Sequence, residues 1–216
     1  MYNMKKFRKL SIISLAVLLT VALLASPTLS WLFTTSDEVV NTFEGGEIAV
    51  RLDEAKVDAE GKAMPNEDRV LQNSYKYVPG SVLDKDPTPV VLAGSVPSYV
   101  FICVDNQEAD IFSLNTDTTH WLQVASKDTK TLYAYYQKVD ASAADVTLQP
   151  IFTKVSVSTE LTLDQLKELK EESATQKIKA QVYAIQSQYI EKNTAIDNAV
   201  ERFVSGATNV TYVNIA

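Results

Sequence analysis

The sequence has few of the residues that most hydrolases and disulfide-stabilised domains need. Its 216 residues include one histidine, His120, and one cysteine, Cys103. A metalloprotease helix needs two histidines on one face beside a glutamate base, and a serine nucleophile needs a base next to it. We therefore expect no catalytic, cofactor-binding or metal site. A lone cysteine excludes an intramolecular disulfide, so Cys103 is expected to be a buried apolar residue.

Acidic pairs offer the remaining candidate ligands. Asp53/Glu54 and Asp84/Asp86 could bind Ca²⁺, but the twelve-residue calcium-loop pattern is missing. They are interpreted as solvated acidic loops. His120 could join carboxylates around a metal, yet no spacing specifies such a site, and a surface histidine at a strand end is expected instead.

The longest apolar run lies near the amino terminus and is short for a membrane span. Leu10–Ala25 is about 16 residues, whereas crossing a bilayer takes roughly 20. Four cations precede it, Pro27 follows, and Thr28-Leu-Ser30 provides small residues at positions −3 and −1. We predict a signal peptide at 1–30, cleaved between Ser30 and Trp31. A cut after Ser26, or an uncleaved anchor, remains an alternative.

Charge limits the partners of the remaining chain. The leader holds four of the 20 basic residues and none of the 27 acidic ones, so the rest carries a net charge of −11. Such an acidic protein is not expected to bind nucleic acid or anionic membranes. Its self-association should depend on salt and pH.

Short segments with alternating apolar residues predict a mainly β domain over 46–216. Expected strands lie at 46–52, 75–78, 82–83, 88–92, 99–104, 121–124, 131–138, 146–157, 176–186 and 209–215. Tyr99–Val104 is apolar on both faces, which is typical of a central strand, whereas Pro87 and Pro89 predict an edge strand. The segments 53–73 and 105–117 are expected to be irregular loops.

Helical periodicity appears twice, at 161–172 and 194–204. Many short strands with two short helical insertions favour an antiparallel β-sandwich. Tyr133, Tyr135 and Tyr136 could form an exposed binding strip, but strand packing is the preferred interpretation.

Five segments, in this order, resemble the TasA/camelysin family of secreted bacterial proteins. They are Trp31–Asp37, which directly follows the leader, Asn41–Gly46, Tyr77–Ser81, Ala93–Val100 and Lys177–Gln186. The resemblance implies a jelly-roll sandwich and a SipW-type signal peptidase. It also implies extracellular fibres of the biofilm matrix that assemble by donor-strand exchange, with a possible accessory matrix protein.

The resulting hypothesis is a secreted structural protein of a Gram-positive bacterium. Residues 31–45 would form a donor segment with Trp31, Leu32 and Phe33 as anchors, because an extended apolar peptide can add a strand to a sheet edge. Donation to the next copy gives a head-to-tail homopolymer, whereas donation to its own domain gives a monomer. The alternatives are a camelysin-type metallo-endopeptidase with His120 as ligand, and a monomeric binding module that uses loops 53–73 and 105–117.

Overall fold

The computed structural model describes residues 47–162 and 178–216, which all belong to one unit, Gly45–Ala216. This part of the chain contains eleven strands and one helix. In chain order these are β1 (Val50–Asp53), β2 (Val82–Asp84), β3 (Thr88–Val91), β4 (Ser95–Asn106), β5 (Phe112–Thr116), β6 (Trp121–Lys127), β7 (Lys130–Tyr135), β8 (Val139–Ala141), β9 (Val146–Thr147), β10 (Phe152–Val157), β11 (Ile178–Gln186) and α3 (Lys192–Val204). No helix among these residues is long and apolar enough to cross a membrane.

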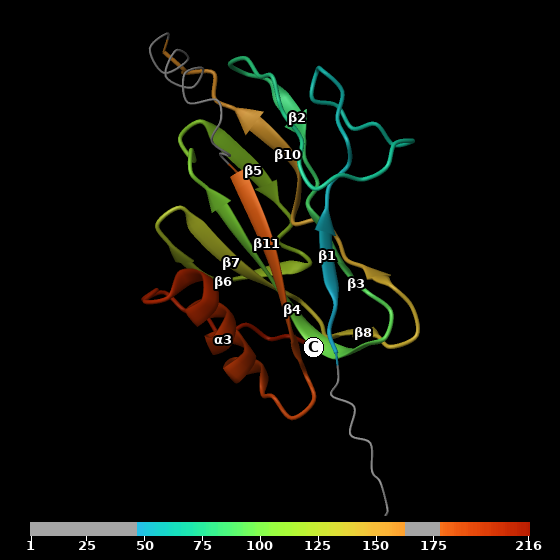
Figure 1. Cartoon of the computed structure of the whole chain (residues 1–216). Coiled ribbons are helices and arrows are strands. Elements are labelled where there is room, and N and C mark those ends of the chain that lie inside the picture. The colour runs from blue at the N-terminus through green and yellow to red at the C-terminus, as the bar shows by residue number, and fades with distance from the viewer. Residues whose placement is uncertain (1–46, 163–177) are drawn as a thin grey trace, which may run out of the picture. The chain divides into compact units, whose positions relative to one another are not determined.

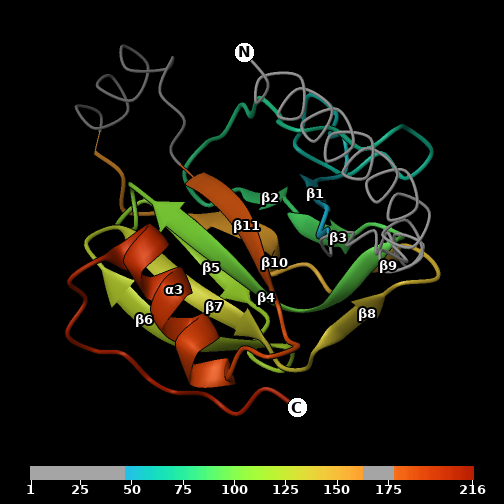
Figure 2. The same ribbon diagram turned by 60° about the horizontal axis from the view of Figure 1, so that its bottom comes forward.

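The strands form three antiparallel sheets (Figure 1). A five-stranded sheet has the order β11-β4-β7-β6, with β8 also pairing with β4, and two three-stranded sheets have the orders β1-β3-β9 and β2-β10-β5. One face of the large sheet packs against the two smaller sheets, and α3 lies on its other face (Figure 2). The predicted mainly β sandwich is confirmed.

Strand β4 lies at the centre of both cores, as its doubly apolar sequence predicted. Val100 and Ile102 point into the core between the sheets, whereas Phe101 and Cys103 point into the core beneath α3. All four are buried, and each large apolar side chain contributes roughly 1.5–3 kcal/mol through its burial. Burial also raises the pKa of the Cys103 thiol to about 11.

The clearest sequence patterns are also confirmed. Strand β11 covers most of the predicted 176–186 strand, and α3 begins two residues before the predicted helix. Gly206 ends the helical region with φ +76°, a left-handed conformation that glycine adopts without steric cost. Strands β6 and β7 form a hairpin whose two-residue turn, shorter than the gap between the predicted strands 121–124 and 131–138, is possible because Asp128 adopts φ +53°.

Three segments around the smaller sheets differ from expectation, and one of them, 75–78, was predicted as a strand but forms none. The acidic segment 105–117, predicted as a loop, contains strand β5, whose Phe112 is buried. Strand β3, predicted as an edge, pairs with both β1 and β9. Pro89, which has no N–H to donate, is tolerated in β3 because it lies beyond the two residues that pair with β9. Its oxygen still accepts a hydrogen bond from Leu148 N.

The carboxy-terminal segment also differs. Residues 209–215, predicted as a strand, have no strand pairing and follow the sheet with isolated bonds, such as Thr211 N to Val124 O. The predicted helix at 161–172 lies almost entirely outside the described residues.

Candidate functional site

A groove of about 980 Å³ lies between the ends of two strands from different sheets. Leu52 and Asp53 of β1 line one side, and the first residues of β11, Ile178 to Val182, line the other. Between them lie apolar side chains of the core and of the segment before β2, namely Tyr75, Tyr77, Leu83, Phe112 and Val155. Leu52, Tyr75 and Tyr77 are only partly buried although they pack on the core. The groove therefore exposes core side chains to an incoming segment.

Both strands direct main-chain groups into the space between them. In an antiparallel ladder, successive residues direct their main-chain groups to opposite sides. Ser187 N bonds to Pro97 O, next to the β11–β4 ladder, so the outward groups on β11 belong to Ala180, Val182 and Ala184. Ala49 O accepts a hydrogen bond from Leu92 N, which directly follows β3. The main-chain groups of β1 that point away from β3 therefore belong to Val50 and Leu52. No ladder joins β1 to β11 among the described residues.

Two other sheet edges are covered. On β6, Thr211 N bonds to Val124 O at 2.7 Å, and the Asn209 side chain bonds to both N and Oγ of Ser126. On β2, Asp84 N donates to Gly61 O, and Lys62 Nζ donates to Val82 O. Within 47–162 and 178–216, loops of the chain thus cover these two edges, whereas no described segment covers the outward edges of β1 and β11, which flank the groove.

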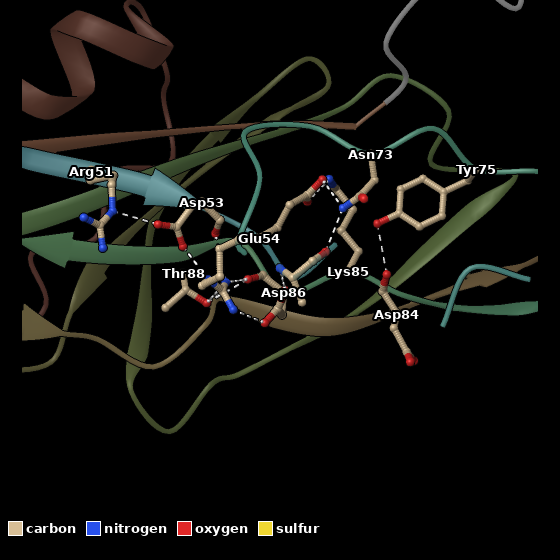
Figure 3. Close-up of polar contacts among 11 residues, drawn as sticks. Arg51, Asp53, Glu54, Asn73, Tyr75, Asp84, Lys85, Asp86 and Thr88 are labelled. Carbon is tan, nitrogen blue, oxygen red and sulfur yellow. Dashed lines mark hydrogen bonds and ion pairs between the residues drawn. The ribbon is translucent and has the colours of Figure 1, made fainter. Parts of the chain in front are cut away.

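Ion pairs around the buried carboxylate of Asp53 hold one wall of the groove in place (Figure 3). Arg69 bonds to the side chains of Asp53, Asp86 and Thr88, and also to the backbone oxygens of Asp53 and Asp86. Arg51 Nε contacts Asp53 at 2.7 Å. Arg69 thereby attaches the segment before the groove residues Leu71–Tyr77 to β1 and β3.

A further ion pair, in which both side chains are largely buried, lies beside these. Lys85 Nζ contacts Glu54 Oε2 at 2.5 Å, and Asn73 Nδ2 donates to Glu54 Oε1 at 3.0 Å. Glu54 is 3% exposed and Asp53 8% exposed. The interpretation of Asp53/Glu54 as a solvated pair is therefore wrong, because their cationic partners come from distant parts of the sequence.

A hydrogen bond between Tyr75 and Asp84 attaches the segment before β2 to that strand. The Tyr75 hydroxyl donates to Asp84 O at 2.9 Å, and burial raises the pKa of that phenol well above its usual value. Burial also acts to raise the pKa of Asp84, but hydrogen bonds from Lys154 and from Ala63 N outweigh it and hold the pKa below its ordinary value.

His120 lies before β6, as predicted for a strand-end histidine. Its Nδ1 lies 2.6 Å from Asp117 Oδ2, and its ring packs edge-on against Tyr136. Burial acts to raise the pKa of Asp117, but the bonds from His120 and from Thr119 N hold it below the ordinary value. No group of three or more potential metal ligands occurs within 47–162 and 178–216.

The tyrosines of the possible binding strip are packing residues. Tyr135 is buried and contacts the rings of Trp121 and Tyr136, each at a centroid distance of 5.0 Å. Tyr133 and Tyr136 are partly buried against the same core. Strand packing, the preferred interpretation, is therefore confirmed.

The residues predicted for cleavage and donation, Ser30, Trp31, Leu32 and Phe33, lie outside the described residues. Sequence reasoning did not locate the groove, because its lining comes from segments more than 100 residues apart. Comparison with known proteins adds no relative, since no family model, curated protein or solved structure matches this chain.

Proposed function

We propose that this chain is a secreted structural protein that polymerises head to tail by donating its amino-terminal segment to the groove of the next copy. The observation that carries the proposal is that, among the described residues, nothing pairs with the outward edges of β1 and β11, which flank a groove lined by partly buried apolar residues. A strand added along the outward edge of β11 would bond to that edge and cover those side chains.

The proposed donor is the segment 31–45, which precedes β1 in the sequence. Its main chain would pair with the outward groups of Ala180 and Val182 on β11. Placing the Trp31 and Phe33 side chains in the groove would contribute roughly 1.5–3 kcal/mol each. Since donor and acceptor are different surfaces, the contact is heterologous and extends into a filament.

Cleavage of the leader and the net charge of the remaining chain are both consistent with such assembly. Cleavage after Ser30 would make Trp31 the first residue of a donor that is free to leave its own domain. The proposal includes a SipW-type peptidase for this step and the extracellular matrix as the location. A net charge of −11 on each processed subunit should make growth faster as salt screens the repulsion.

The first experiment compares the chain beginning at Trp31 with a chain beginning at Ser36. Light scattering and negative-stain microscopy over time should show filaments for the first and folded monomers for the second. Monomers from both, at all salt concentrations, would refute the proposal and favour a binding module. Filaments from both would show that the segment Trp31–Thr35 is not the donor.

Proline substitution in β11 tests the acceptor edge. Ala180→Pro removes an N–H that points out of the sheet, a position where edge strands tolerate proline, so the fold should persist while filament growth stops. Gln181→Pro removes an N–H of the ladder to β4 and should destabilise the domain itself. Ala180→Val is the matched control and should assemble normally. Normal growth of a folded Ala180→Pro variant would exclude β11 as the acceptor.

A further inference from the structure

Strand β11 is apolar on both faces over only half of its length. On one face, alternate side chains pack towards the core between the sheets along the whole strand: Ile178, Ala180, Val182 and Ala184. On the α3 face, Lys179 and Gln181 are exposed. The next two residues on that face, Tyr183 and Ile185, are partly buried against the core beneath α3. An added strand would therefore find apolar contacts on both of its faces only beside 182–185.

Tyr183 and Ile185 form a surface that we call the α3-side ledge. Helix α3 packs mainly on β6 and β7, at the other side of the sheet from β11 (Figure 2). Its carboxy-terminal end reaches Tyr183, whose ring centroid lies 6.2 Å from that of Phe203 and 5.1 Å from the guanidinium carbon of Arg202. Phe101, opposite Tyr183 on β4, contacts the same ring at 6.3 Å. The Tyr183 ring is therefore held in place on the outermost strand of the sheet.

The proposed donor begins with three apolar residues, Trp31, Leu32 and Phe33, and the polar stretch 34–37 follows. Successive side chains of a strand point to opposite faces. When the two aromatic side chains point into the groove, Leu32 therefore points to the α3 face, whichever way the donor runs. The apolar start of the donor thus has the same two-faced pattern as residues 182–185 of β11.

We infer that Leu32 in the donor of a second copy lies beside Tyr183 on the α3-side ledge. The residues on either side of Leu32 then point into the groove, next to Val182 and Ala184. The main-chain groups of Tyr183 point to β4, so in an antiparallel ladder it would form a non-hydrogen-bonded pair with Leu32, in which side chains approach most closely. This inference rests on the proposed function and adds the acceptor residues for each face of the donor.

Two other placements of the donor are less favourable. Beside Lys179 or Gln181, Leu32 would find only exposed polar side chains on its face. With Leu32 in the groove instead, one aliphatic side chain would face a volume of about 980 Å³, and the two aromatic rings would lie on the α3-side ledge. Because protein interiors are close-packed, the larger cavity is better matched by the larger side chains.

Substitution of Leu32 tests the contact without changing the acceptor. In the chain beginning at Trp31, Leu32→Ala should raise the critical concentration for filament growth about fivefold, because an apolar cross-strand pair is lost. Leu32→Met keeps most of the side-chain volume and should stay within about twofold of the unchanged chain. An unchanged critical concentration for Leu32→Ala would overturn the inference.

The matched control is Val40→Ala, which removes an apolar side chain on the same face of the donor. With Leu32 beside Tyr183, residue 40 lies beyond the end of β11 in either direction. Val40→Ala should therefore leave the critical concentration unchanged, and an effect equal to that of Leu32→Ala would contradict the inference. In both cases donor assembly itself would still stand if removal of 31–35 abolished filaments. Absence of filaments from the chain beginning at Trp31 would refute the proposed function and the inference together.

Cysteine cross-linking tests the two faces of the donor. Paired residues of neighbouring strands have Cα atoms about 4.5–5.5 Å apart, within the range that a disulfide can bridge. Filaments of Leu32→Cys/Tyr183→Cys should give a covalent ladder under oxidation, and Cys103 does not compete because it is buried. Phe33→Cys/Tyr183→Cys carries the same acceptor change, but its donor cysteine points into the groove and should not cross-link. A ladder from this second variant, or none from filaments of the first, would overturn the assignment of Leu32 to the α3-side ledge.

Discussion

The buried pair Lys85–Glu54 allows a quantitative test of how the groove wall is held. The side chain of Glu54 is 5% exposed and that of Lys85 15% exposed, with the charged atoms 2.5 Å apart. Lys85→Met keeps most of the apolar stem and removes the charge, which leaves Glu54 with Asn73 as its remaining side-chain donor.

Removing one partner of a buried pair typically costs about 3–5 kcal/mol, because the other charge stays buried without compensation. Since Asn73 still donates to Glu54, we expect about 3 kcal/mol for Lys85→Met at pH 7. In a domain of this size that corresponds to a fall in melting temperature of roughly 6–12 °C. Adding Glu54→Gln removes the uncompensated buried charge. The free energy of unfolding of the double variant should therefore recover to within about 1 kcal/mol of that of the unchanged protein.

The measurement is urea unfolding followed by far-ultraviolet circular dichroism, with the chain beginning at Ser36 so that assembly does not interfere. Lys154→Met is the matched control. Its partner Asp84 is also a carboxylate, but the lysine side chain is 51% exposed, so the loss should stay below about 1 kcal/mol. A loss below 1 kcal/mol for Lys85→Met, or a double variant less stable than the single one, would refute the reasoning.

Three further predictions concern other described residues. Gly61→Ala should cost more stability than Gly94→Ala in thermal unfolding: both have positive φ, but a Cβ at 61 would lie 2.6 Å from Leu83 Cδ2 and one at 94 would meet nothing within 4 Å. Cys103, buried and with a pKa of about 11, should react with a thiol reagent at pH 8 only after unfolding. Asp84→Asn should destabilise the domain by about 1 kcal/mol at pH 7. The pKa of Asp84 is lowered in the folded state. Its contribution to the free energy of unfolding is therefore present above the ordinary pKa near 3.9 and is lost as the pH falls through the folded pKa. The difference in urea midpoint between Asp84→Asn and the unchanged protein should shrink below about pH 4.

Local sequence patterns were sufficient for much of the sandwich. Strict alternation located β11, and the doubly apolar run located β4, because these patterns reflect which faces of a strand are covered. The tail 209–215 has the same kind of pattern yet forms no strand, since it follows β6 with isolated bonds. Pattern alone reports the burial of alternate side chains and not the presence of a ladder.

Acidic residues were harder to place from sequence. Asp53 and Glu54 look like the start of a solvated loop, but Arg69 and Lys85 bring compensating charge from 16 and 31 residues away. Nothing near Asp53 in the sequence indicates that pairing. In the same way, the groove depends on β1 and β11 being neighbours, although they lie at opposite ends of the domain sequence.

The distribution of covered edges is the strongest physical argument for a strand-accepting groove. Natural sheets protect their edges because unpaired main-chain groups invite pairing with other chains. In this domain, loop 58–63 covers the edge of β2 and the carboxy-terminal segment covers the edge of β6. Within the described residues, β1 and β11 have no such cover, and the side chains between them are apolar and partly exposed. An edge left open beside a partly exposed core is costly for a monomer, and a donated strand removes both costs at once.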